Sequence, residues 1–299
     1  MKKLAIIFCT CLLPGYLLAQ VHSEKITREL TFEKKGPQNT VMVYNINGDV
    51  KVTGYAGDKI LVEVEKIIRG KTEARVEAGK ADIQLGITDR ADSIMIYMEG
   101  PCHSFGKQSR RHHKRLNGWG YNWDDCCNRR GNDCERNGYD YEMNFTVKVP
   151  NGINVAASTV NNGDVVLENV SGAVIAENVN GSIKLTNIAG ATYASTINGD
   201  VDLDYSKNPN GDSRYYSLNG DINAYFIRGL AANVAFESFN GSFYTNIDKM
   251  ETLEPMVKEA SNKGEGIKYK IGGNRYKVGA GGVLLDFETF NGNAYLREK

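Results

Sequence analysis

The sequence predicts an all-β fold in which the chain winds as a β-solenoid, with rungs of about 18–21 residues and two insertions. Glycines recur every nine residues through the centre of the chain, from Gly163 to Gly199. Apolar and polar residues alternate between these glycines, as they do in half-buried strands. The chain also contains 32 glycines against six prolines, which suits frequent tight turns.

Residues 1–19 have the pattern of a secretory signal peptide. Two lysines follow the first residue, and an apolar run over 4–18 ends at Ala19 before a polar residue. The run is shorter than the roughly 20 residues that span a bilayer, so we expect cleavage after Ala19 and no transmembrane segment in the mature chain. Lipid attachment at Cys9 or Cys11 is less favoured, because small residues do not precede them. The predicted location is the periplasm, the outer-membrane surface or the extracellular space.

Residues 20–100 are predicted to hold N-terminal strands and the first rung of the repeat. Alternation over 26–32 predicts an opening strand, and 72–81 is the best helix candidate. The segment 41–52 places valines on both sides of Asn47-Gly48. This is the unit that recurs in the centre of the chain, so the first rung lies well ahead of the others. Further strands are expected at 83–85 and 93–98.

Residues 141–299 are predicted to form the solenoid repeat domain, with an insertion at about 250–282. Alternation points the apolar residues of each unit to one side. The predicted core residues are Val165, Leu167, Val170, Ile183, Leu185, Ile188, Val201 and Leu203. Every second unit carries Asn-Gly, and Asn162, Asn180 and Asn198 are spaced by 18 residues. The later pairs begin at Asn219, Asn240 and Asn291.

An antiparallel meander is the alternative to the solenoid, because Asn-Gly between alternating apolar residues is a strong hairpin signal. Three observations favour the solenoid. Asn-Gly comes at every second turn, the apolar phase is kept through each turn, and equivalent residues match in type. Stacked rungs would place asparagine above asparagine and valine above valine, which gives a side-chain ladder and a continuous core.

These motifs resemble those of a known family. The N-G-D-V and N-G-S-I turns, the T-F-N-G-N-A-Y-L ending and the secretory leader are similar to the putative-adhesin family of bacterial β-strand-repeat proteins, related to head GIN domains. The similarity covers 41–66 and 141–299, and 101–140 departs from it. It implies a right-handed parallel β-solenoid in the cell envelope, with no assigned catalytic residue and no cofactor.

Aspartates follow Asn-Gly in several units, at Asp49, Asp164, Asp200 and Asp221. A stacked row of carboxylates could bind calcium or act on a polysaccharide. Tight turns also favour aspartate for conformational reasons. Ser182, Ser242 and Asn293 take the same place in other units, so the position does not require a charge. We therefore favour a role in the turn.

Residues 101–140 are predicted to be an insertion, because no apolar period survives there. It holds the four cysteines of the mature chain, and an even count in an exported protein favours disulfides. A metal site is the less favoured alternative, because no C-x-x-C or H-x-x-x-H spacing is present. Its candidate ligands are Cys102, His103, His112, His113, Cys126, Cys127 and Cys134.

The same insertion contains alternating aromatic residues beside basic ones. Trp119, Tyr121 and Trp123 could stack on sugar rings or anchor a partner protein, and Arg110 and Arg111 could attract an acidic glycan. The same aromatics could instead form a small core that holds the insertion together. Both interpretations remain open at this point.

Two functions follow from these observations. The first is a non-enzymatic, exported envelope protein that acts as an adhesin-like or structural binding module toward a surface glycan or an envelope protein. The second is a polysaccharide lyase or hydrolase built on a parallel β-helix. The chain lacks G-x-S-x-G, H-E-x-x-H and a phosphate-binding glycine loop, which favours the first. Acidic and basic residues balance at 36 each, so a nucleic-acid partner is not expected.

Overall fold

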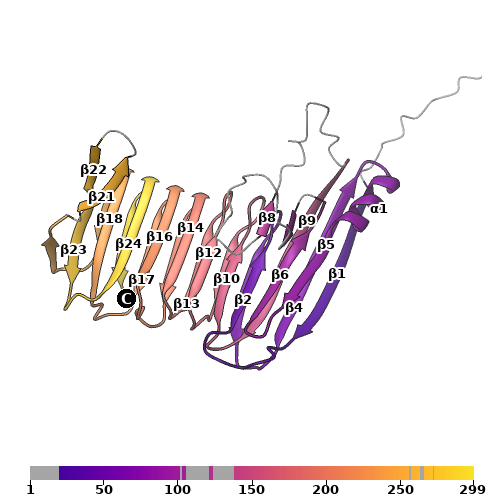
Figure 1. Ribbon diagram of the computed structural model, residues 1–299, viewed down its shortest axis with the longest axis horizontal. Coiled ribbons are helices and arrows are strands. Elements are labelled where there is room, and N and C mark those ends of the chain that lie inside the picture. Colours follow the sequence, from indigo (N-terminus) through magenta and orange to yellow (C-terminus); the bar gives the residue numbers. More distant parts are fainter. Residues whose placement is uncertain are drawn as a thin grey trace, which may run out of the picture.

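The computed structural model describes residues 20–101, 103–105, 121–123, 138–255, 257–262, 266–271 and 273–299. Within these residues the fold is all-β, with two large mixed sheets and one helix, α1 (Glu73–Asp82) (Figure 1). We call the ten-stranded sheet A and the eleven-stranded sheet B.

In spatial order, sheet A contains β1 (Gln20–Leu30), β4 (Ile60–Gly70), β9 (Tyr139–Pro150), β3 (Val50–Tyr55), β11 (Val165–Glu168), β13 (Ile183–Ile188), β15 (Val201–Tyr205), β17 (Ile222–Phe226), β25 (Ala294–Glu298) and β19 (Phe243–Thr245). Sheet B contains β20 (Met250–Leu253), β23 (Asn274–Val278), β18 (Ala232–Asn240), β24 (Val283–Asn291), β16 (Ser213–Asn219), β14 (Thr192–Asn198), β12 (Val174–Glu177), β10 (Asn154–Ser158), β2 (Thr40–Tyr44), β6 (Ser93–Glu99) and β5 (Gln84–Asp89). Two small antiparallel pairs are β7 (His103–Phe105) with β8 (Tyr121–Trp123), and β21 (Val257–Asn262) with β22 (Gly266–Ile271).

Through the centre, the chain passes from a strand of sheet B to a strand of sheet A and back. Neighbouring strands in each sheet are parallel, with Val174 opposite Thr192 in sheet B. Residues that stack on one another in neighbouring strands are 18 positions apart in the sequence in the centre of the chain, and 21 positions apart after β15. The prediction of an all-β fold with parallel strands is confirmed. In the N-terminal part, β2 and β3 pair in parallel with β10 and β11.

Two rungs lie out of chain order. β24 and β25 lie between β16/β17 and β18/β19, so Phe287 pairs with Tyr215 on one side and Phe236 on the other (Figure 1). At the other end, β6 and β9 lie beyond β2 and β3. At both ends, a later part of the chain therefore pairs between two strands that come earlier in the sequence.

The core lies between the two sheets, and all eight predicted core residues are at most 2% exposed. This confirms the predicted register. The third apolar position is less buried in the units that carry Asn-Gly, where Val179 is half-buried and Ile197 is 40% exposed. These residues come directly before the turn asparagine, where the chain leaves the core. Aromatic rings fill the later rungs, and Tyr205 stacks on Phe226 at a centroid distance of 4.9 Å.

The turns from sheet B to sheet A depend on close backbone contact between rungs. A Cβ atom on Gly220 would lie 2.1 Å from the carbonyl oxygen of Gly199, and one on Gly199 would lie 2.3 Å from that of Gly181. Such distances exclude any side chain. Glycine recurs at this turn because the stacked rungs leave no room for anything larger.

An asparagine ladder runs beside these glycines. From Asn180 onward, each Nδ2 donates to the Oδ1 of the asparagine in the preceding rung, at 2.8–2.9 Å. The members in spatial order are Asn161, Asn180, Asn198, Asn219, Asn291 and Asn240. The prediction that Asn162 aligns with Asn180 is wrong by one residue. Asn162 is an extra residue with a positive φ of 55°, a conformation that asparagine tolerates better than most residues.

The helix α1 covers the N-terminal end, one residue away from its predicted bounds at each end. The Thr72 side chain accepts the Arg75 N–H at 3.4 Å and caps its start. At its other end, the buried Lys66 Nζ donates to the carbonyl oxygens of Lys80 and Ile83, at 3.2 and 2.9 Å. No helix among the described residues has the length and apolar character needed to cross a membrane.

The register makes a stability prediction at Leu185, which is 1% exposed. Leu185→Ala should lower the free energy of unfolding by about 2–5 kcal/mol, because it opens a cavity between the sheets. Lys184→Ala, on the exposed face of the same strand, should change it by less than about 0.5 kcal/mol. Urea denaturation followed by circular dichroism measures both, and equal losses would contradict the register.

Candidate functional site

Most residues predicted to bind a metal or a partner lie outside the described residues. These are Cys102, Arg110, Arg111, His112, His113, Trp119, Cys126, Cys127 and Cys134. His103, Tyr121 and Trp123 lie in β7 and β8, whose backbones place His103 opposite Trp123. Elsewhere in the described chain, no group of three or more His, Cys, Asp or Glu residues is arranged to hold a metal ion. The disulfide, metal and aromatic hypotheses for the insertion stay predictions.

The turn aspartates lie in a row along one edge. Each accepts, through one carboxylate oxygen, a hydrogen bond from a backbone N–H of the next rung: Asp49 accepts from the Asp164 N–H at 2.9 Å, and Asp200 accepts from the Asp221 N–H at 2.8 Å. Asp164 and Asp221 accept the N–H groups of Ser182 and Asn293, both at 2.7 Å. Ser182 and Asn293 accept in the same way. The aspartates thus act as turn residues that link neighbouring rungs.

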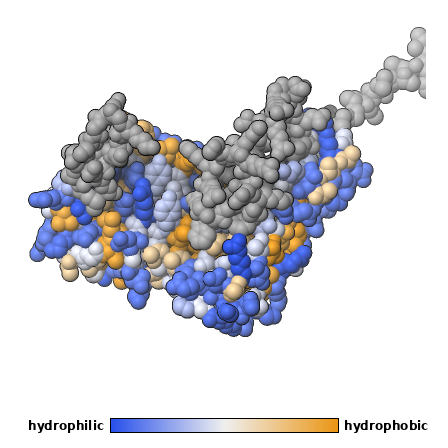
Figure 2. Space-filling view, viewed as in Figure 1, coloured by the Kyte–Doolittle hydropathy of each residue, from blue (hydrophilic) through white to orange (hydrophobic). Residues whose placement is uncertain are grey.

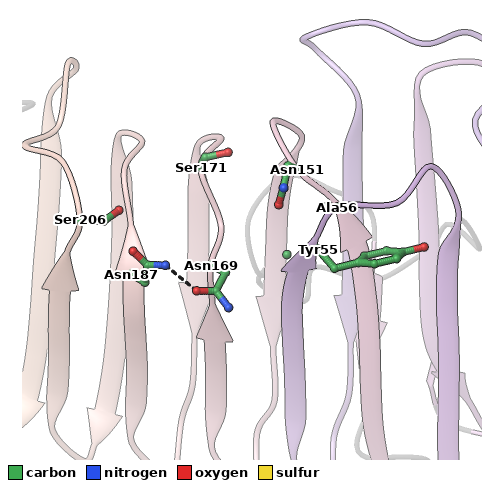
Figure 3. A pocket seen from close by; sticks show the side chains of 8 residues that line it. Tyr55, Ala56, Asn151, Asn169, Ser171, Asn187 and Ser206 are labelled. Atoms are coloured by element: carbon green, nitrogen blue, oxygen red, sulfur yellow. Dashed lines mark hydrogen bonds between the residues drawn. The ribbon is translucent and has the colours of Figure 1, made fainter.

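A groove lies on the opposite edge, where the chain leaves sheet A for sheet B. It has a volume of about 450 Å³ and is lined by Gly54, Tyr55, Ala56, Asn151, Asn169, Ser171, Asn187 and Ser206. Figure 3 shows the asparagine and serine side chains on successive turns, with the Tyr55 ring directed away from them. No lining residue carries a charge. The lining therefore offers hydrogen bonds without an electrostatic preference for anions or cations.

The hydrogen bonds within the groove leave several polar atoms for a ligand. The Asn187 side-chain Nδ2 donates to the Asn169 side-chain Oδ1 (Figure 3), and both residues have a positive φ, of 56° and 59°. The Asn169 amide nitrogen and the Asn187 amide oxygen make no side-chain hydrogen bond to described residues. Asn151 is exposed and likewise makes none through its side chain. The sequence carried a signal for this site, because Asn169 and Asn187 are 18 residues apart. It was missed because neither precedes a glycine.

A single carboxyl group on the outer face of sheet B is electrostatically unusual. Glu177 lies between Ser158 and Ser195 in neighbouring strands. Its Oε2 is buried without a hydrogen-bond partner, and burial raises the pKa of Glu177 to about 7. No basic residue contributes to this pKa.

Figure 2 shows the surface in the orientation of Figure 1, where apolar and polar side chains are interspersed.

No model of a protein family matches the chain, and no curated protein matches it. Among solved structures, it is similar to a "putative cell adhesion protein" from Clostridium sporogenes, with 8% identity and a TM-score of 0.43, over 93% of this chain and 100% of that chain. It is also similar to a "putative adhesin" from Bacteroides fragilis, with 11% identity and a TM-score of 0.34, over 92% of this chain and 97% of that chain.

The aspartate row makes a prediction that separates turn chemistry from calcium binding. Asp200→Ala should lower the free energy of unfolding by about 1 kcal/mol, because the Asp221 N–H loses its acceptor. Asp200→Asn should be close to neutral, since Asn293 makes the same bond in another rung. Thermal unfolding with calcium and with a chelator checks this. A calcium-dependent stabilisation that Asp200→Ala removes would contradict it.

Glu177 makes a pH-dependent prediction. Its pKa in the folded chain is about 7, above the ordinary value of 4.5. Between these two pH values the folded state holds a proton that the unfolded state has lost. This contribution to stability is present below about pH 4.5 and is lost as the pH rises through about 7. Glu177→Gln should therefore be more stable than the parent at pH 8, by about 1–3 kcal/mol, and equal to it below pH 4.5. Glu33→Gln, at an exposed position, is the control, and urea midpoints at both pH values decide the matter.

Proposed function

We propose that this chain is a non-enzymatic binding module of the bacterial cell envelope, adhesin-like in role and exported by the signal peptide at 1–19. The observation that supports binding most directly is the uncharged groove at the sheet A turns. The turn aspartates, which the enzyme alternative would use, are hydrogen-bonded to the backbone of neighbouring rungs.

The fold that presents this groove is, in our proposal, a right-handed parallel β-solenoid with rungs of 18–21 residues. Its support is the alternation of the chain between two sheets and the regular register of most of the parallel ladders. The proposed domains are the N-terminal part over 20–100, the insertion over 101–140 and the repeat domain over 141–299. In such a fold each side chain on a turn recurs about 4.8 Å further along, so a repeated residue becomes a row.

The ligand that fits the groove is a neutral glycan. Sugar hydroxyls donate and accept hydrogen bonds, and the asparagine amides and serine hydroxyls of the groove do the same. A row of such groups along successive turns matches a chain of linked sugars better than a single small ion. The predicted contact by Trp119, Tyr121 and Trp123 remains part of the proposal, as a second place where the ligand or a partner is held.

Binding of fluorescently labelled neutral oligosaccharides on an array, followed by titration of those retained, tests this proposal. Asn151→Ala combined with Ala56→Trp, which removes an amide and fills the groove, should weaken binding by at least about tenfold. Lys184→Ala, on the outer face of sheet A, should leave binding unchanged. Circular dichroism of each variant confirms that the fold is retained.

A second variant tests the insertion. Residues 102–134 are replaced by a short Gly/Ser linker, which should leave the two large sheets intact, because long loops add little to core stability. Binding lost only in this variant would place the contact in the insertion and overturn the groove. Retention of no neutral oligosaccharide would overturn the glycan proposal. Release of unsaturated uronate from a polysaccharide, lost in Asp200→Ala, would overturn the non-enzymatic proposal.

A further inference from the structure

Sheet A ends on an open strand at the C-terminal side of the molecule. β19 pairs with β25, and within the described residues no strand pairs with its other side. In a parallel ladder the backbone groups of alternate residues face each neighbour. The Ala294 N–H donates to the Ser242 carbonyl, so the backbone groups of Phe243 and Thr245 face away from β25. In sheet B, β23 pairs with β18 over 232–236, and no described strand pairs with residues 238–240 on that side.

This stretch, Ser238–Thr245, is the terminal edge, and it carries no charge. The other outer strands do. β1, at the far end of sheet A, contains Glu24, Lys25, Arg28 and Glu29, and β20 contains Glu251. Charged residues on an outer strand oppose pairing with another chain. The terminal edge lacks this protection.

Three side-chain rows stop at the terminal edge with one side unused. Phe239 stacks on Phe290 at 4.8 Å and is 74% exposed, and Tyr244 stacks on Tyr295 at 5.0 Å and is 49% exposed. Asn240 donates to Asn291, and its own Oδ1 accepts from no described residue. Each row would continue if one more strand followed.

We propose that the terminal edge docks an extended strand of a partner protein, parallel to β19, that carries an aromatic residue followed by Asn-Gly and a second aromatic residue three positions after that glycine, as Phe290 and Tyr295 are placed in the neighbouring rung. The neighbour already present shows what such a strand supplies, since β25 places Tyr295 opposite Tyr244 and the preceding turn places Asn291 beside Asn240. A strand with this pattern extends both aromatic rows and the asparagine ladder, and it satisfies the open backbone groups.

The partner contributes an extended strand, and it is not the same end of a second copy of this chain. Sheet B continues past β18 through β23 and β20, so it is two strands longer than sheet A at this end. A second copy approaching end to end would meet these strands before it reached β19. An extended segment reaches the terminal edge beside them.

The test uses the full chain and a synthetic peptide of residues 288–298, ETFNGNAYLRE, which reproduces the strand that β19 already accepts. Fluorescence anisotropy should show saturable binding. Phe239→Lys combined with Tyr244→Lys should weaken it by at least about tenfold, because charges oppose pairing at an edge. Tyr193→Lys, at an exposed tyrosine on sheet B, should not change it. A peptide with serine at the positions of Phe290 and Tyr295 should bind at least about tenfold more weakly.

Hydrogen exchange shows where the peptide binds. Added at the terminal edge, it should protect the amides of Phe243 and Thr245, which face away from β25, and leave the amides of β25 as they were. No saturable binding, or equal binding by the double lysine variant, overturns the proposal. Faster exchange in β25 would show that the peptide displaces it, which also overturns the proposal. Sedimentation that shows a dimer of the unliganded chain, broken by Tyr244→Lys, would assign the edge to a second copy instead.

Discussion

The structure depends on how closely one turn can lie on the next. At the turns from sheet B to sheet A, the backbone of each rung occupies the place that a Cβ atom would need, with a neighbouring carbonyl oxygen about 2 Å from that position. This approach sets the rungs at the separation at which asparagine side chains join and aspartate side chains reach the next N–H. The ladder, the aspartate row and the parallel sheets all follow from that one contact. A larger residue at Gly199 or Gly220 would separate the rungs and disrupt all three.

The regular part of this fold was predictable because its physical causes are periodic. Alternation fixed the direction of residues such as Leu185 and Val201, and the core confirms them. Alternation could not place Ile197, since its neighbour Asn198 belongs to the turn and the chain has already left the core. Asn162 was misplaced for a related reason. In Asn161-Asn162-Gly163 either asparagine could occupy the ladder, and only the positive φ of Asn162 separates them.

The order of the rungs was not predictable from the repeat. Asn219, Asn240 and Asn291 have the same chemistry, and each fits beside any of the others, so similarity cannot say which are neighbours. The structure places Asn291 between the other two. The groove was not predictable for the opposite reason, because its residues do not share one sequence motif. Asn151, Asn169 and Asn187 lie on neighbouring turns although their sequence contexts differ, because the two edges of the fold use different turns.

The late rung also bears on how the molecule assembles. When β18 and β19 have left the ribosome, their final neighbour has not yet been made, and residues 246–282 separate them from it. The pairings that join β24 to β16 span about 70 residues, and long-range contacts of this kind slow folding. In the meantime β18 can match β16 directly, since Ser217 and Ser238, and Asn219 and Asn240, are equivalent in register. If β16 and β18 pair in that interval, they must separate before β24 can take its place between them.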